Sequence, residues 1–272
     1  MKKSLLFPLV LLFASSFIYI QYADGGKKKY SKMVWSDEFN SSGLPDSTKW
    51  SYDLGDGCPN ICGWGNNELE YYTVERERNA RVENGNLIIE LHNEPFGGRD
   101  YTSARLTSKG KGDWLYGRFE IRAKLPVGKG TWPAIWMLPS DKTYGDWPHS
   151  GEIDIMEKVG YDPDTIVSAA HTLSFNAASG THKVDNIWVG DNDEEYHTYI
   201  LEWDQDEYRT YVDDRIIFTY KKTGDSYAEW PFDKKFHLIL NIAYGGNWGG
   251  AMGLEDAALP TRMEIDYVRV YQ

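Results

Sequence analysis

Hydrophobic and polar positions alternate along several stretches of this chain, with the period of two that is typical of β-strands. Residues 118–125 show this most clearly, because Phe119, Ile121 and Ala123 are separated by charged residues. Side chains point alternately to the two faces of a strand, so one face here is expected to be buried. Residues 264–270 alternate less regularly. Both segments are predicted to be strands.

Short turn sequences separate the predicted strands. Asn84-Gly85 precedes the apolar run 87–91, and Asp213-Asp214 divides two further runs of β-forming residues. Asn-Gly is a strong hairpin sequence, since both residues tolerate a positive φ. We find no capped segment of helical period, and the chain has 26 glycines. The pattern predicts an all-β sandwich of curved antiparallel sheets, with a concave face on which a polymer can lie.

The amino terminus has the composition of a processing segment. Lys2 and Lys3 precede the apolar stretch 5–20, and Ala23 offers a cleavage point. We interpret residues 1–23 as a secretory signal peptide, with an uncleaved membrane anchor as the alternative. The protein is then secreted, periplasmic or bound to the cell surface. No repeat or linker interrupts the remainder, so residues 33–272 are predicted to be one domain.

The charge and aromatic content of the chain restrict the kinds of molecule that it can bind. Removing the two lysines of the predicted signal peptide lowers the formal net charge from −12 to −14. Such an acidic protein repels nucleic acid, anionic lipid and sulfated polysaccharide, which leaves a neutral substrate. Aromatic residues make up 15% of the chain, including 11 Trp. Flat rings of this kind either fill a core or stack on the apolar faces of sugars.

The only two cysteines, Cys58 and Cys62, lie close together. In an exported protein they are expected to form a disulfide that restrains one loop. The alternative is half of a metal site, although no second Cys or His cluster at ligand spacing completes it.

Three acids lie among apolar residues in the segment Gly151–Glu157. In a regular strand Ile153 would face the core, while Glu152 and Asp154 would share the opposite face. Carboxylates this close repel one another, so a structural role alone is a poor explanation. A retaining glycosidase needs such a group: one carboxylate as nucleophile and one carboxylic acid about 5–5.5 Å away. A calcium site and a solvated strand are the alternatives.

Glu157 lies at an odd spacing from Glu152, so a regular strand would turn it toward the core. An unpaired carboxylate is costly there. We therefore predict a β-bulge around Ile155-Met156, with Met156 as the extra residue. The bulge would bring Glu152, Asp154 and Glu157 to the concave face, with the two glutamate carboxyls about 5–6 Å apart.

The residues around this segment resemble glycoside hydrolase family 16, in particular its laminarinase-like endo-β-1,3-glucanases. The likeness extends from about residue 34 to the end of the chain. It is carried by Trp35–Phe39, Gly65–Glu68, Thr131–Pro139, Trp147–Glu157, Gly245–Gly250 and Ile265–Tyr271. Several separate motifs in the family's order are far more specific than one.

The resemblance implies a β-jelly roll with the substrate cleft across its concave sheet, and it implies roles for the acids. Glu152 corresponds to the nucleophile, Glu157 to the general acid/base and Asp154 to a residue that assists them. No metal or other cofactor takes part in this chemistry.

The resemblance also implies sugar-binding residues. Trp132 and Trp136 would stack at the non-reducing side of the cleaved bond, and Trp147 would lie near the leaving group. Residues expected to donate to sugar hydroxyls are Asn66, Arg105 and Asn247. His171 would be a cleft residue close to the acid/base. Core packing remains the alternative for Trp136, and a structural role remains the alternative for His171.

Family members often bind a structural calcium on the convex side. Glu38, the carbonyl of Gly85 and Asp266 occupy the comparable positions here. Hard oxygen ligands of this type suit calcium. The alternative is that the two acids are merely solvated.

The expected activity is endo-hydrolysis of β-1,3-glucan by a monomer, with β-1,3-1,4-glucan as a second substrate. The inserted Met156 favours the laminarinase type, and the acidity disfavours sulfated galactans. A transglycosylase and a hydrolase of agar or carrageenan share these catalytic residues, so both remain open. A non-catalytic glucan-binding protein is disfavoured, because both glutamates are present.

Overall fold

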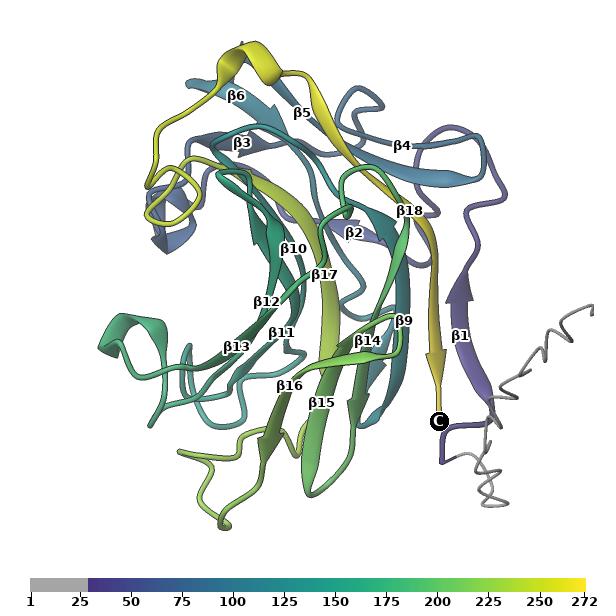
Figure 1. The fold of residues 1–272 in the computed structure, drawn as a ribbon, viewed down its shortest axis with the longest axis vertical. Coiled ribbons are helices and arrows are strands. Elements are labelled where there is room, and N and C mark those ends of the chain that lie inside the picture. Colours follow the sequence, from purple (N-terminus) through teal and green to yellow (C-terminus); the bar gives the residue numbers. More distant parts are fainter. Residues whose placement is uncertain (1–28) are drawn as a thin grey trace, which may run out of the picture.

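The computed structural model describes residues 29–272, so the predicted signal peptide or anchor lies outside the described residues. Figure 1 shows strands arranged in two curved layers around a common interior. The strands are β1 (Met33–Asp37), β2 (Ser51–Tyr52), β3 (Glu70–Tyr72), β4 (Ala80–Glu83), β5 (Asn86–Phe96), β6 (Arg99–Ser103), β7 (Arg105–Thr107), β8 (Asp113–Trp114), β9 (Gly117–Lys124), β10 (Thr131–Pro139), β11 (Glu152–Val159), β12 (Asp162–His171), β13 (Lys183–Trp188), β14 (His197–Trp203), β15 (Glu207–Val212), β16 (Arg215–Lys221), β17 (Phe236–Tyr244) and β18 (Thr261–Tyr271).

Helical structure within the described residues is confined to three short 3-10 turns, η1 (Cys62–Gly65), η2 (Ala177–Ser179) and η3 (Asp256–Ala258). None of the helices in this part of the chain has the length and apolar character needed to cross a membrane. The prediction of an all-β fold is confirmed.

The two sheets differ in size and role. The 10-stranded sheet runs β16-β15-β14-β9-β18-β5-β6-β3, with β1 and β4 alongside it, and the 8-stranded sheet runs β13-β12-β11-β10-β17-β7-β2, with β8 alongside. Neighbouring strands are antiparallel except for β3 and β6. The smaller sheet is the concave one, which opens on the left of Figure 1.

The strands predicted for residues 118–125 and 264–270 and the hairpin turn at Asn84-Gly85 are all present. Asn84 and Gly85 form the turn of the β4–β5 hairpin, both with positive φ. The irregular pattern near the C terminus has a physical cause, because the β18–β9 register shifts between Ile265 and Tyr267. After this bulge the buried positions move from odd to even residues, so that Val268 faces the core.

The core lies between the sheets. Phe119 and Ile121 of β9 meet alternate residues of β17, including Leu240, in one cluster of buried side chains. Each such side chain contributes roughly 1.5–3 kcal/mol by leaving water. The intervening residues of β17, such as Ile239 and Asn241, face the other way, toward the concave surface.

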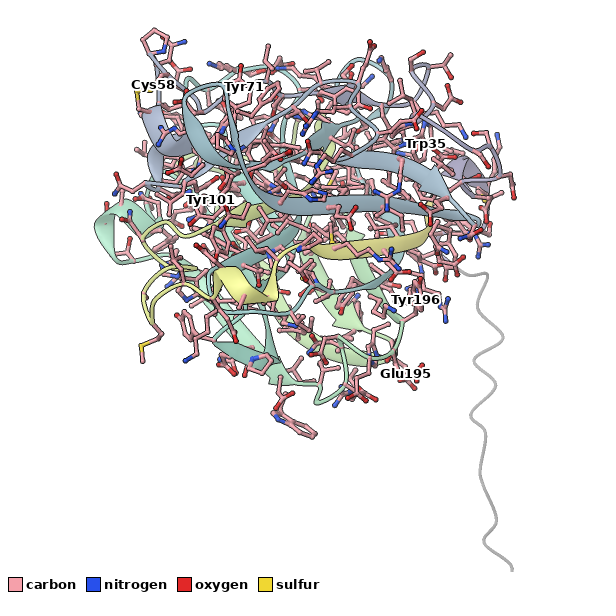
Figure 2. The ribbon with its side chains drawn as sticks, turned by 90° about the horizontal axis from the view of Figure 1, so that it is seen from above. Trp35, Cys58, Tyr71, Tyr101, Glu195 and Tyr196 are labelled. Carbon is pink, nitrogen blue, oxygen red and sulfur yellow. A yellow bond between two sulfur atoms is a disulfide. The ribbon has the colours of Figure 1, made fainter. Side chains whose placement is uncertain are left out.

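Cys58 and Cys62 are joined by a disulfide with an S–S distance of 2.08 Å. The bond closes a small loop at the periphery of the molecule (Figure 2). This loop leads through η1 directly to Asn66, at one end of the concave face. The bond is local scaffolding for this rim, and nothing in the described residues completes a metal site around it.

Candidate active site

The acids lie on β11, in the middle of the concave sheet, and the predicted bulge is present. Against β10, Met156 pairs with Ile135 and Asp154 pairs with Trp136, so Ile155 has no partner. The prediction that Met156 would be the extra residue is therefore wrong for the pairing with β10, where Ile155 is the extra residue. Ile155 and Met156 are both completely buried in the core, which explains how two consecutive apolar residues replace the alternation.

The bulge returns Glu157 to the face that carries Glu152 and Asp154. Glu157 is partly exposed, and its Oε1 accepts a hydrogen bond of 3.0 Å from Nε1 of Trp132, across the cleft surface. Against β12 the register also slips by one residue between Asp154 and Glu157. The separation of 5–6 Å between the glutamate carboxyls stays a prediction.

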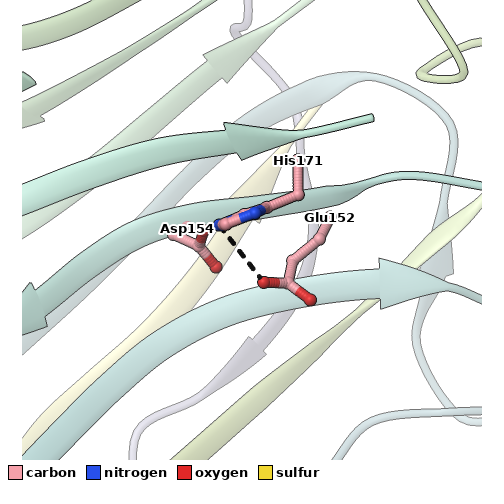
Figure 3. Close-up of side chains that lie close together, drawn as sticks. All are labelled: Glu152, Asp154 and His171. Carbon is pink, nitrogen blue, oxygen red and sulfur yellow. Dashed lines mark ion pairs between the residues drawn. The ribbon is translucent and has the colours of Figure 1, made fainter. Parts of the chain in front are cut away.

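His171 lies directly opposite Glu152, at the end of β12. Its Nε2 is 3.1 Å from Oδ2 of Asp154, outside hydrogen-bond geometry, and 3.6 Å from Oε1 of Glu152 (Figure 3). Among the described residues, no contact within ion-pair distance joins His171 to Glu157. Strand pairing places this histidine directly against the predicted nucleophile, while its charge also acts on Glu157. Its closeness to the acid/base stays a prediction.

Two influences act on the imidazole of His171. Burial disfavours its charged form, but Glu152 and Asp154 prevail and raise its pKa to about 10. The amide of Ala177 donates to Nδ1 at 3.2 Å, which favours the neutral ring with its hydrogen on Nε2. In both forms Nε2 carries a hydrogen that faces the carboxylates. The ring therefore stabilises negative charge in the acid group through its proximity to the two carboxylates.

Burial raises the pKa of Glu152 and of Glu157 to about 8, and the charge of Asp154 adds to this in each case. His171 and the indoles of Trp147 and Trp132 oppose the rise. Three neighbouring carboxylates that are shielded from water repel one another when all are ionised. The group of Glu152, Asp154 and Glu157 therefore retains a proton near neutral pH. A group that keeps one acid protonated beside ionised neighbours has the composition needed for combined nucleophilic and acid catalysis.

Glu152, Asp154 and His171 are also the described residues that come nearest to a metal site, with ligand atoms within 4.8 Å of one another. A metal would need a bare Nε2, whereas the hydrogen bond that Nδ1 accepts from the amide of Ala177 favours the ring with a hydrogen on Nε2. The donor set therefore fits proton chemistry better than metal binding.

An aromatic wall stands beside the acids on β10. Trp132 packs edge-on against Trp248, with ring centroids 5.4 Å apart, while its indole nitrogen holds Glu157. Trp136 is half-buried on the same face and donates a 2.7 Å hydrogen bond to Asn241. Trp136 is thus on the concave surface, and the core-packing alternative is excluded.

The guanidinium of Arg105 is layered between the rings of Trp64 and Trp136, at 4.5 and 4.7 Å. Its Nε lies 2.9 Å from Asp53 Oδ2. The ion pair and the two rings hold a nearly buried cation against the cleft wall. Arg105 therefore braces the platform of Trp136, and the sequence motif did not reveal Trp64 as its second partner.

The two predicted asparagines come together from distant segments. Asn66 follows η1, and its carbonyl accepts from the amide of Asn247 at 2.7 Å. The side chain of Asn66 donates to Glu68, and that of Asn247 accepts from Asn67. Both asparagines therefore lie at one rim of the cleft, and the side chain of each forms a hydrogen bond with another residue of the protein.

Trp147 stands at the other end of the acid strand. It is 45% exposed, and its ring centroid lies 6.1 Å from that of His171. His182, which no sequence motif indicated, stacks in parallel on His171, with ring centroids 5.3 Å apart. Trp147 is therefore beside Glu152 and His171, whereas Trp132 is beside Glu157.

The predicted calcium ligands have other partners. Arg269 donates to both oxygens of Glu38, at 2.9 and 2.7 Å, and Arg122 donates to Asp266 at 2.7 Å. Each carboxylate is thus already neutralised by an arginine, and the side chains of this group do not fit a calcium ion without displacing those pairs. The calcium site stays a prediction.

Residues 67–269 match the family model of Glycosyl hydrolases family 16. A beta-glucanase of Rhodothermus marinus is 48% identical over 100% of this chain and 95% of its own length. The structure of the laminarinase from Rhodothermus marinus has a TM-score of 0.85 at 50% identity, covering 89% of this chain and 97% of that one. The structure of a mutant of SCLam, a non-specific endo-β-1,3(4)-glucanase, co-crystallised with 1,3-β-D-cellotriosyl-glucose, has a TM-score of 0.85 at 46% identity. The match covers 90% of this chain and 96% of that one.

Proposed function

Because the chain belongs to glycosyl hydrolases family 16, we propose that it is a retaining endo-β-1,3-glucanase that also accepts β-1,3-1,4-glucan. The observation that carries the mechanism is the bulge of β11, which brings Glu157 to the face of Glu152 and gives each glutamate a different neighbour. Glu152 lies beside the imidazole of His171, while Glu157 lies beside the indole of Trp132.

In the first step an oxygen of Glu152 attacks the anomeric carbon, and the bond from that carbon to the glycosidic oxygen breaks. The leaving oxygen takes its proton from Glu157. The contact of His171 with Glu152 and Asp154 favours negative charge at that end of the group, which leaves the shared proton to Glu157.

In the second step Glu157, now ionised, removes a proton from water. The water oxygen attacks the same carbon, and the bond to Glu152 breaks. Two inversions leave the product with the configuration of the substrate. Asp154, which is almost completely buried between the glutamates, helps keep the pair from ionising together.

The substrate assignment rests on the relatives and on charge. The three similar proteins described above are named as a beta-glucanase, a laminarinase and an endo-β-1,3(4)-glucanase. The net charge of −12 opposes binding of sulfated polymers. We extend the proposal to export of the protein and to its action as a monomer.

The deciding experiment combines product analysis with proton NMR. The purified protein is incubated with laminarin, mixed-linkage glucan, agarose and carrageenan, and the first anomer formed is recorded. We expect internal cleavage of laminarin and slower cleavage of mixed-linkage glucan, with the β-anomer first. Initial α-anomer would refute the retaining mechanism. Preferred cleavage of agarose or carrageenan would refute the substrate, and mainly transferred products would indicate a transglycosylase.

A further inference from the structure

One large aromatic side chain on the concave sheet has no place in the site described above. Trp188 ends β13, the edge strand of that sheet, and is 66% exposed. An indole exposed to this extent offers a flat apolar surface on which a pyranose ring can stack.

Strand register puts Trp188 on the same face as the acids. Residues paired across antiparallel strands point to the same side. Trp188 pairs with Thr165, and its neighbour Ile187 pairs with Ile166, whose side chain is in the core. Since Ile187 packs against the core, Trp188 must face the opposite, concave side.

A row of paired residues crosses the sheet from the aromatic wall to this edge strand. In order, the row is Arg105, Asn241, Ala134, Glu157, Val167 and Asn186. Trp188 lies one side-chain repeat along β13 from Asn186. Because strands are about 4.8 Å apart, β13 is roughly 10 Å from β11. Trp188 is therefore on the far side of the acids from Trp132 and Trp136.

The backbone around Trp188 keeps its ring in place. A Cβ at Gly190 would come within 2.4 Å of the Trp188 ring, so the ring rests directly against a glycine with positive φ. The carbonyl of Trp188 accepts from Arg215 at 3.2 Å, which ties the end of β13 to β16. The indole is thus supported on one side and open to solvent on the other.

From these observations we infer that Trp188 is a distal sugar-stacking subsite that binds the same neutral β-glucan chain that Glu152 and Glu157 cleave. The inference rests on the proposed function. A polysaccharide that crosses the strands along the row reaches Trp188 only when it extends two strands beyond the acids. The subsite therefore serves long chains, while short oligosaccharides are processed without it.

The test compares substrates of increasing length. For Trp188→Ala we expect kcat/KM on laminarin to fall about fivefold, mainly through KM, whereas Trp188→Phe retains most of it. The rate on oligosaccharides too short to reach β13 should not change. Met33→Ala, on β1 of the other sheet, is the control, because Met33 is 51% exposed and apolar.

Equal rates for Trp188→Ala and the unaltered protein at every chain length would overturn the subsite. An equal loss at every length would also overturn it, because it would indicate a general structural defect. If the unaltered protein cleaves no glucan, the proposed function fails independently. Affinity electrophoresis in laminarin gels then tests the subsite alone, with Trp188→Ala migrating faster if it exists and unchanged if it does not.

Discussion

Two groups of neighbouring acids adjoin the cleft in the described part of the chain, and one of them has the surroundings of a catalyst. Glu152, Asp154 and Glu157 occupy the bulged strand on the concave face, where both glutamates are partly exposed. Glu68 and Glu70 lie at one end of the same cleft, but Glu70 has no exposed surface. Its Oε2 accepts from the amide of Tyr244, while its Oε1 has no partner.

Burial and the neighbouring Glu68 raise the pKa of Glu70 well above its usual value, as burial and Asp154 do for the catalytic pair. A raised pKa is therefore insufficient to identify a catalytic acid. The open group differs in two ways: solvent reaches its glutamates, and a hydrogen-bond donor on the cleft surface points at Glu157. Glu157 contacts both solvent and an indole, whereas the Glu68–Glu70 pair is enclosed. Glu68 accepts a hydrogen bond from Tyr72, whose hydroxyl accepts one from Asn241. Asn241 in turn accepts the hydrogen bond from Trp136. The enclosed pair supports the platform.

The largest effect should come from removing the open acids. Glu152→Ala and Glu157→Ala are each expected to lower kcat about a thousandfold, because each removes a covalent or proton-transfer step. Azide should restore part of the activity of Glu152→Ala, with an inverted product. Initial rates on laminarin and the product anomer provide the measurement. A variant with more than a tenth of the original rate would contradict the role of that residue.

The pH profile is expected to be bell-shaped. The catalytic form carries one proton on the pair, and burial raises the pKa of both glutamates to about 8. Activity should therefore persist through neutrality and fall about tenfold per pH unit above the higher apparent pKa. Measuring kcat/KM from acid to alkaline pH checks this. A rate that keeps rising above pH ~8 would exclude Glu157 as the acid.

Thermal stability should change in the opposite direction to activity when a catalytic glutamate is replaced. For Glu157, a pKa of about 8 in the folded protein lies above the ordinary glutamate value of 4.5. The stabilising effect of its protonated form is therefore complete below pH 4.5 and is lost as the pH rises through 8. Glu157→Gln removes this loss, and its melting temperature should exceed that of the unaltered protein by about 3 °C at alkaline pH and less at acid pH. Calorimetry across this range is the measurement, and a lower melting temperature at alkaline pH would contradict the burial argument.

Glu70→Gln should leave activity within about threefold, since Glu70 touches no substrate surface, while removing a buried charge at alkaline pH. The amide has nearly the same shape and can still accept from Tyr244. Kinetics on laminarin provide the measurement. A thousandfold loss would show that the enclosed pair takes part in the chemistry.

The smallest effect concerns the rim. The paired change Cys58→Ser and Cys62→Ser should lower stability by at most about 2 kcal/mol, because the closed loop is short. Kinetics on laminarin should be nearly unchanged. Mass analysis of the unaltered protein after alkylation should reveal no free thiol. Two reactive thiols in the folded protein would disprove the bond.

Local patterns predicted much of the fold. Alternation in residues 118–125 identified a strand with one buried face, and Asn84-Gly85 identified a hairpin. The odd spacing of Glu157 even predicted the bulge, because a buried unpaired carboxylate is costly whatever the surroundings. These features depend on side-chain period and backbone conformation, which neighbouring residues determine.

The partners across strands could not be predicted in this way. The contact of His171 with Glu152, the position of Arg105 between Trp64 and Trp136, and the concave orientation of Trp188 all depend on register. Register results from packing two whole sheets together, and a shift of one residue would turn each of these side chains to the other face. The sequence by itself therefore determined which residues could do chemistry and the local shape of their strand. Only the tertiary structure decided which of them meet, because the two sheets must bury one common core.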